Sequence, residues 1–385
     1  MRIAFYAPLK SPAHGTPSGD RRVAALLVEA LRRAGHEVEL ASEFRSLELK
    51  GDGQRQTELR AQGIERMQAL VARWKSGPAA ECPQLWLTYH VYYKAPDWIG
   101  PGVCAALGIP YVIAEASFAP KRAGGPWALG HEAARDAIAR ADLLLAPTRY
   151  DIECLRPLVS RLDRIVQLPP FLDARPFQDA RQARDGHRMR LAARHGLDAT
   201  IPWMIVAAMM RPGDKLASYR ELAAALASLA DLRWELLIAG DGLARAEAAA
   251  VLEAAAPGRS RFLGELHGAD LAAAHASGDL YVWPAVNEAY GMALLEAQAA
   301  GVPVVSCALR GVPDVVCHGD TGLLAPPGDP PALAMLARQL LLDSERRRAM
   351  GLRAQAWVGS ERSLETAARR LDHALARIVA HASAH

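Results

Sequence analysis

Two carboxylates, Glu288 and Glu296, are separated by seven residues in the segment NEAYGMALLEAQAAGVPVV. The segment reads as a loop and then a helix that opens at Tyr290-Gly291, so Glu288 stands near a helix N-terminus, a place that suits a phosphate. Glu296 follows roughly 12 Å further along the helix axis, at 1.5 Å per residue. A carboxylate accepts hydrogen bonds from two vicinal hydroxyls. The pair could hold two ends of one ligand that carries a phosphate and sugar diols, although a dipole-favoured glutamate and an ordinary surface glutamate would give the same spacing.

The elements that must position these residues follow a repeated strand–helix pattern. Short apolar runs, each followed by a turn rich in Gly, Pro or Asp, predict buried parallel strands at 2–8, 36–42, 84–90, 109–117, 141–148, 164–173, 201–210, 235–240, 261–266, 280–285 and 302–307. Such alternation predicts an α/β fold with two Rossmann-like domains whose parallel sheets face a central cleft. We expect an N-terminal domain at 1–173, a linker at 174–200, a C-terminal domain at 201–359, and a final helix at about 360–385 that packs back on the N-terminal domain.

Composition leaves most other function classes without support. The 385 residues carry 45 basic and 42 acidic side chains, a net charge of +3, which does not indicate a nucleic-acid partner. Five cysteines without a C-x-x-C pair fit reduced thiols. The longest apolar run, WMIVAAMM, is too short to span a bilayer. We therefore expect a cytoplasmic protein, at most peripheral at the inner face of a membrane. A helix at 55–77 has an apolar stripe of Ile64, Met67, Val71 and Trp74, which fits a surface helix that packs on the sheet or an amphipathic helix that rests on anionic lipid.

Several motifs together carry a family resemblance. E-x7-E followed by A-x-A-x-G-x-P-V-V resembles the signature of retaining GT-B glycosyltransferases, family 4 (glycosyl transferases group 1). The segments ELLIAGDG (235–242) and RGVPDVVCHGDTGLLAPPGD (310–329) resemble neighbouring blocks of that family, with Asp314 where Glu is usual. The resemblance covers most of residues 201–360 and thins out in the N-terminal half. It implies a GT-B fold and a hexosyltransferase that moves a sugar from a UDP-, GDP- or ADP-sugar to an acceptor hydroxyl with retained configuration.

The resemblance also implies roles for individual residues. Glu296 would bind the ribose hydroxyls and Glu288 a hydroxyl of the transferred sugar. Arg211 and Lys215 would neutralise the diphosphate, whose growing charge preorganised cations stabilise. The remaining donor-binding positions supply backbone near the diphosphate or the base: Gly19, Gly264, Ala289, Tyr290, Gly291 and Met292. R-P-G-D-K is shorter than the family spacing, and a solvated turn would explain Arg211 and Lys215 as well.

The N-terminal half departs from the family at one position. The family often carries a His after the strand that here reads YVIAEASF, and the matching position falls near Ala116. Glu115, its neighbour, and His90, at the end of WLTYH, are the two candidates for the acceptor- or sugar-facing role. A lone His at a strand end is also often structural. Loop cations at Lys94, Lys121 and Arg122 could face the acceptor.

Other readings stay open at this stage. No D-x-D sequence occurs, so we expect no essential metal and no cofactor besides the sugar-nucleotide substrate. A sugar-nucleotide epimerase or hydrolase on the same fold is one alternative. A non-catalytic binder of nucleotide sugars is another. The residues do not identify the donor sugar, the base, the acceptor or the oligomeric state.

Overall fold

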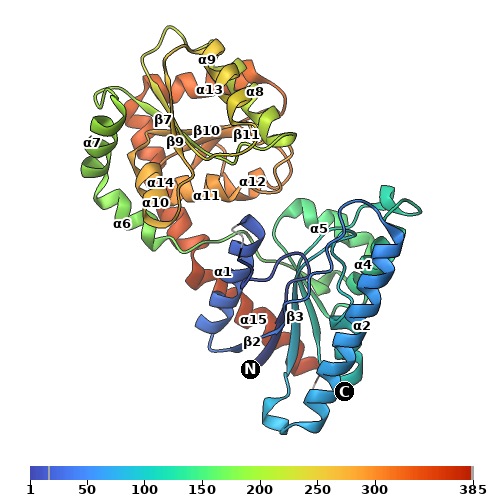
Figure 1. The fold of residues 1–385 in the computed structure, drawn as a ribbon. Helices are drawn as coiled ribbons and strands as arrows, with labels where there is room; N and C mark the ends of the chain where they lie inside the picture. The colour runs from blue at the N-terminus through green and yellow to red at the C-terminus, as the bar shows by residue number, and fades with distance from the viewer. Residues whose placement is uncertain (16–17, 383–385) are drawn as a thin grey trace. The chain divides into compact units, whose positions relative to one another are not determined.

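The computed structural model describes residues 1–15 and 18–382. Residues 16–17 of the loop before Gly19 and residues 383–385 of the predicted final helix lie outside the described residues. The chain divides into two compact units, the first comprising Met1–Pro169 and the segment from Leu364 onward, the second comprising Pro170–Ser363. Each unit holds one parallel six-stranded sheet (Figure 1). The predicted α/β fold with two Rossmann-like sheets is confirmed.

In the first unit the strand order is β2-β1-β3-β4-β5-β6. The strands are β1 (Arg2–Tyr6), β2 (Glu37–Ser42), β3 (Leu85–Val91), β4 (Tyr111–Ala116), β5 (Leu143–Ala146) and β6 (Ile165–Gln167). The helices are α1 (Gly19–Arg33), α2 (Gly53–Ser76), α3 (Gly100–Leu107), α4 (Ala128–Arg140), α5 (Arg149–Leu155) and α15 (Leu364–Ala382). Short 3-10 turns lie at η1 (Ala79–Glu81), η2 (Pro120–Arg122), η3 (Arg156–Leu158) and η4 (Leu162–Arg164). Although α15 ends the chain, it packs beside α1 (Figure 1).

In the second unit the strand order is β12-β11-β10-β7-β8-β9. The strands are β7 (Trp203–Ala207), β8 (Glu235–Ala239), β9 (Ser260–Gly264), β10 (Leu280–Trp283), β11 (Val304–Cys307) and β12 (Gly322–Ala325). The helices are α6 (Arg175–Gln182), α7 (Arg184–His195), α8 (Asp214–Ala227), α9 (Arg245–Ala255), α10 (Gly268–Ser277), α11 (Met292–Ala299), α12 (Val312–Val315), α13 (Pro330–Leu342) and α14 (Ser344–Glu361). Most strands of this unit are buried, because helices cover both faces of a parallel sheet. Their burial explains the apolar runs in the sequence.

Each sheet reverses its strand order once. In the first unit the reversal lies between β1 and β3, and in the second it lies between β7 and β10. At such a point the loops that leave two neighbouring strands turn in opposite directions and open a crevice at the carboxyl ends. The loops after β1, β3, β7 and β10 are therefore the places where each unit can bind a ligand.

Two local predictions differ from the structure. Residues 174–200, expected to be a linker, form α6 and α7, and both helices pack on α10. Phe177 and Ala180 are buried there, and so is the long side chain of Arg188. On α2 the predicted apolar stripe is confirmed in part: Trp74 is buried and Met67 and Val71 pack against the core, whereas Ile64 is exposed and Gly63 beside it is buried. In the described part of the chain no helix is both long and apolar enough to cross a bilayer.

Candidate functional site

Lys215 and Glu288 meet at the strand reversal of the second unit. Lys215 is the second residue of α8, after β7, and Glu288 lies in the loop after β10. The Lys215 ammonium forms an ion pair with the Glu288 carboxylate, and both side chains remain about one quarter exposed. Lys215 Nζ also lies 5.9 Å from the ring centre of Trp283. Two of the predicted residues, 73 apart in sequence, thus form one charged pair at the place where this fold binds ligands.

The loop that carries Glu288 is fixed by side chains of α8. Ser218 Oγ accepts a hydrogen bond from the Val286 N–H at 3.0 Å and donates one to the Asp214 carbonyl at 2.9 Å. Asn287 donates to the Asp214 carboxylate at 2.7 Å. The backbone is left-handed at Ala285, with φ of 59°, and at Asn287, with φ of 54°. This conformation is costly for alanine, whereas asparagine tolerates it. The position of Glu288 is therefore imposed on the loop rather than being its relaxed conformation.

Arg211 lies in the loop between β7 and α8. It is exposed, and within the described residues its side chain has no hydrogen bond or ion pair. The preceding backbone is held by the turn after β8, since Met210 N–H donates to Asp241 O at 2.9 Å. The predicted residue Gly264 closes β9, and its carbonyl accepts from Gly240 N–H at 2.7 Å. Arg211 is thus an available cation on a backbone that the neighbouring turn holds in place.

A substitution at Gly240 tests whether the turn after β8 holds the backbone that leads to Arg211. A Cβ added at Gly240 would lie 2.0 Å from the Ala208 carbonyl oxygen, so the loop that leads to Arg211 must move. Gly240→Ala should lower the free energy of unfolding by about 2 kcal/mol or more. It should also weaken binding of any anion held by Arg211. The matched control is Gly258→Ala, also at positive φ but with no atom within 4 Å of the new Cβ, which should cost about 1 kcal/mol and spare binding. Equal losses in urea unfolding would contradict the role of close approach.

Glu296 is buried rather than an ordinary surface glutamate. It lies on α11 with 4% of its surface exposed, and its Oε2 is 3.5 Å from Nε2 of His275 on α10. His275 is fully buried and stacks on Tyr281, whose hydroxyl hydrogen-bonds the backbone of Ala207. Burial raises the pKa of Tyr281, and the Glu296 and Glu288 carboxylates raise it further, so both carboxylates act on one phenol. Sequence reasoning missed His275, because a single His in an Ala-rich helix gives no signal.

The remaining predicted donor residues form the link between Glu288 and α11. Ala289 is exposed, and its carbonyl accepts from Gly311 N–H at 3.0 Å. Tyr290 and Met292 are half-buried. Gly291, with φ of 76°, is the N-cap residue of α11, and no side chain caps the first turn of the helix. That arrangement is the one the prediction required for a phosphate near the helix N-terminus.

In the first unit, three ionisable side chains meet at the strand reversal. His90 Nδ1 lies 3.1 Å from Asp20 Oδ1 and 3.6 Å from Glu115 Oε1. Asp20 follows Gly19 at the start of α1, whereas His90 and Glu115 lie near the ends of adjacent strands β3 and β4. Both His90 (φ 63°) and Glu115 (φ 60°) are left-handed. The two residues predicted as alternatives therefore belong to one strained cluster, together with Asp20.

The cluster favours a charged imidazole. Burial lowers the pKa of His90, but the Glu115 carboxylate and the hydrogen bond to Asp20 outweigh burial and raise the pKa above 6.5. Burial raises the pKa of Asp20, but the hydrogen bond and charge of His90 outweigh it and hold the pKa below 3.8. An imidazolium donates from both ring nitrogens and accepts no proton. His90 is thus suited to bind an oxygen atom rather than to act as a general base.

The shifted pKa of His90 predicts a pH dependence. A His whose pKa is raised by folding stabilises the protein fully below its unfolded pKa of about 6.5, and the stabilisation disappears as pH rises through the folded pKa. The melting temperature of the protein should exceed that of His90→Asn most at about pH 6 and least at alkaline pH. Asn tolerates the left-handed backbone, so the comparison isolates the charge. A difference that grows with pH would contradict the assignment.

Beside this cluster, aromatic rings and cations gather on the loops after β3 and β4. Tyr93 and Trp127 pack edge to face at 5.6 Å. Lys94 Nζ lies 5.0 Å and Arg122 Cζ 5.5 Å from the Trp127 ring centre. Lys121, the third predicted loop cation, is exposed.

Two observations fall outside the predicted site. The first unit holds a cavity of about 600 Å³ between α3, the loop before β6 and α15, and none of the predicted site residues lines it. The ionisable residues that were predicted to act on a substrate lie at the strand reversals, where this fold binds ligands. Among residues 1–15 and 18–382, no group of three or more His, Cys, Asp or Glu side chains could hold a metal ion.

The segment that holds Lys215, Glu288 and Glu296 is similar to known proteins. Residues 214–357 match the family model of the glycosyl transferases group 1. The match includes Lys215, Glu288 and Glu296. A sulfoquinovosyl transferase of Arabidopsis thaliana is 41% identical over 93 residues, which are 23% of this chain and 18% of that protein. An N-acetyl-alpha-D-glucosaminyl L-malate synthase of Bacillus anthracis is 45% identical over 80 residues, 21% of each chain. The chain thus matches only about a fifth of the length of these relatives.

Solved structures match over nearly the whole length. The Anabaena protein HepE, in a crystal structure with UDP, superposes with a TM-score of 0.75 at 18% identity, covering 98% of this chain and all of that one. Sucrose-phosphate synthase of Thermosynechococcus elongatus gives 0.72 at 21% identity, covering 99% of both chains. At these identities the likeness shows the fold alone. The predicted GT-B fold is confirmed.

Proposed function

We propose that this chain is a glycosyltransferase that moves a sugar from a nucleoside-diphosphate sugar to an acceptor hydroxyl, with retained anomeric configuration. The observation that carries the proposal is the Lys215–Glu288 pair at the strand reversal, beside the uncapped start of α11. This pair lies in the segment that matches the glycosyl transferases group 1. A cation, a carboxylate and a helix N-terminus supply partners for a diphosphate and for sugar hydroxyls.

Different parts of the donor would bind to different loops of the second unit. Arg211, which has no partner among the described residues, would bind the diphosphate together with the first turn of α11. Glu288 would accept a hydroxyl of the transferred sugar, and Glu296 the ribose hydroxyls. Lys215 is already paired with Glu288, so it would be shared between that carboxylate and the diphosphate. The UDP in the Anabaena structure favours UDP-sugars as the first donors to try.

The cluster in the first unit would serve the other substrate. His90, held between Asp20 and Glu115, would donate a hydrogen bond to the acceptor or to the transferred sugar. Gly19 begins α1, and a Cβ there would meet no atom of the described residues within 4 Å. The reaction requires no metal or organic cofactor in this proposal, and no protein nucleophile is assigned.

A panel of nucleotides tests the proposal. A ligand that binds only the folded state stabilises it by about 2.7 kcal/mol at one hundred times its Kd. We expect UDP, GDP or ADP, with or without a linked sugar, to raise the melting temperature saturably. Arg211→Gln should weaken that response, whereas Arg190→Gln, an exposed arginine on α7, should not. If no nucleoside diphosphate shifts melting, the donor site is wrong.

Two other functions would give different products. An epimerase or hydrolase would consume the donor without any acceptor, and a non-catalytic binder would shift in melting temperature without turnover. Product analysis by nuclear magnetic resonance, with and without candidate acceptor sugars, separates the three. The anomeric coupling of the first product reports retention or inversion.

A further inference from the structure

A second charged hollow lies in the second unit, at the opposite end of the sheet. It is a cavity of about 450 Å³ bordered by Pro202, Asp279 and Pro303, which precede β7, β10 and β11. Five of its lining residues are arginines: Arg181, Arg184, Arg188, Arg347 and Arg348. One carboxylate, that of Asp279, lines it with them. The Rossmann-like site lies at the carboxyl ends of the strands, so this cavity at their amino ends is separate from it.

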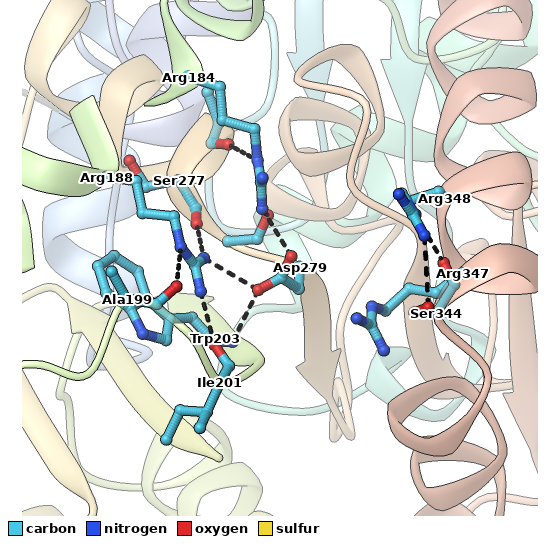
Figure 2. A network of polar contacts seen from close by, with 12 residues as sticks. Arg184, Arg188, Ala199, Ile201, Trp203, Ser277, Asp279, Ser344, Arg347 and Arg348 are labelled. Carbon is cyan, nitrogen blue, oxygen red and sulfur yellow. Dashed lines mark hydrogen bonds and ion pairs between the residues drawn. The ribbon is translucent and has the colours of Figure 1, made fainter. Parts of the chain in front are cut away.

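The Asp279 carboxylate accepts hydrogen bonds from two of the arginines. Arg184 donates to Asp279 Oδ1 at 2.6 Å and Arg188 to Oδ2 at 2.9 Å, and Oδ2 also accepts from Trp203 N–H at 2.9 Å. Arg188 donates further to the carbonyls of Ala199 and Ile201. Figure 2 shows the two guanidinium groups meeting at Asp279. These contacts hold the start of β10, and they occupy both carboxylate oxygens of Asp279 with hydrogen bonds.

The other three arginines have no carboxylate contact among the described residues. Arg347 donates to the carbonyls of Leu340 and Leu341 at the end of α13, and Arg348 donates to Ser344. For Arg181 no hydrogen bond or ion pair is found in the described part of the chain. Burial, and then the charge of Arg184, lowers the pKa of Arg181. Like charges that share one hollow repel, and the lining sets one carboxylate against five guanidinium groups, so the cavity carries an excess of positive charge.

Burial lowers the pKa of Arg347, as it does that of Arg181. The Asp279 carboxylate counteracts this for both arginines, and Asp185 and Asp343 add a smaller effect for Arg181 and Arg347 respectively. Neither Asp185 nor Asp343 lines the cavity. Asp343 instead caps α14 by accepting from Arg346 N–H at 2.8 Å. The first turn of α14, with Ser344, borders the cavity (Figure 2).

We propose that this arginine cavity binds a small molecule carrying a phosphate monoester. The planar guanidinium fork matches phosphate oxygens in pairs, and a dianion compensates several cations at once. A volume of about 450 Å³ lies within the usual range for small-molecule sites. The bound phosphate would contact Arg181, Arg347 and Arg348. The proposal does not depend on the chemistry at Glu288.

Occupancy of the cavity would act on the elements that carry the donor site. Asp279 begins β10, and the loop that follows β10 carries Glu288. Gly301, also in the lining, follows α11, which carries Glu296. A phosphate that tightens the amino ends of these strands would therefore stabilise the second unit as a whole.

The test uses two double variants with the same change in charge. Arg181→Gln with Arg348→Gln removes cavity arginines that have no carboxylate contact, so folding should be preserved. Arg190→Gln with Arg346→Gln removes exposed arginines of α7 and α14 that lie outside the cavity. Titration calorimetry and melting with glycerol 3-phosphate, at constant ionic strength, should show saturable binding to the protein and to the control. Binding should be at least 10-fold weaker in the cavity variant and unchanged in Arg211→Gln.

Three outcomes would overturn the proposal. One is no saturable binding, one is equal loss in both double variants, and one is loss in Arg211→Gln, which would move the phosphate to the donor loop. A vesicle arm distinguishes the source of the phosphate. If phosphatidate vesicles, but not phosphatidylcholine vesicles, bind in a way that only the cavity variant loses, a lipid headgroup is the source. If glycerol 3-phosphate alone binds in that way, the source is a soluble ester.

Discussion

Glu288→Gln should lower kcat/KM for sugar transfer about 100-fold, which is about 2.7 kcal/mol at 1.36 kcal/mol per factor of ten. Glutamine keeps the shape but accepts hydroxyl hydrogen bonds without a charge, and hydrogen bonds to charged groups are worth about 1.5–3 kcal/mol. The structure adds a second expectation. Because the Lys215 ammonium now loses its carboxylate, it becomes available to the diphosphate. Affinity for the free nucleoside diphosphate should stay equal or increase.

The comparison needs a matched ion pair elsewhere. Arg220 and Glu247 form a surface pair in the same unit with both side chains about half exposed. Glu247→Gln should change neither kinetics nor nucleotide affinity, since exposed pairs contribute little. Lys215→Gln should reduce both transfer and nucleotide affinity. If Glu288→Gln instead weakens nucleotide binding as much as it slows transfer, the carboxylate does not face the sugar.

Much of the fold could be predicted because parallel strands are buried on both faces. Such strands read as short continuous apolar runs, and eleven of the predicted runs overlap β1 to β11. Strand β12, GLLA, was not predicted, and it lies within the segment 310–329 that resembled a family motif. The polar composition of residues 174–200 also led to the prediction of a linker where the structure has two helices. Few apolar residues mark α6 and α7, and the buried side chain of Arg188, which donates to the Ser277 carbonyl, helps to attach α7 to its neighbours.

The helix α2 shows why periodicity does not identify a buried face by itself. The predicted stripe has helical spacing and its residue Trp74 is buried, but at the position of Ile64 the neighbouring Gly63 is buried instead. A Cβ on Gly63 would lie 2.4 Å from Trp98 Cβ, so the helix approaches its neighbour through its smallest residue. A hydrophobicity pattern cannot show an approach that depends on a missing side chain.

The site could be predicted in its residue types but not in its pairings. Spacing and family resemblance selected Lys215 and Glu288, but only the adjacency of β7 and β10 brings them together. In the same way, His90 and Glu115 were alternatives in the sequence, and the pairing of β3 with β4 makes them one cluster. Strand order is a long-range property that local residue patterns do not contain.

Glu296→Gln should weaken nucleoside diphosphate binding about 10- to 100-fold. A buried carboxylate that accepts two hydroxyls loses charge-assisted hydrogen bonds when it becomes an amide, and each is worth about 1.5–3 kcal/mol. Glu296 also contacts His275, so the same substitution disturbs a buried pair. A fall in melting temperature is therefore expected in any case and does not by itself report on the ligand.

The role of Glu296 is best separated from that of His275 by changing the nucleotide. If Glu296 binds the ribose diol, the protein prefers a ribonucleotide over its 2′,3′-dideoxy analogue, and Glu296→Gln largely abolishes the preference. His275→Gln, which disturbs the same pair from the other side, should lower the melting temperature and retain the preference. If both variants retain it, Glu296 acts as a buried structural partner of His275, and the donor site must find the ribose elsewhere. The preference is a difference between two ligands on one variant, so losses in overall stability cancel from it.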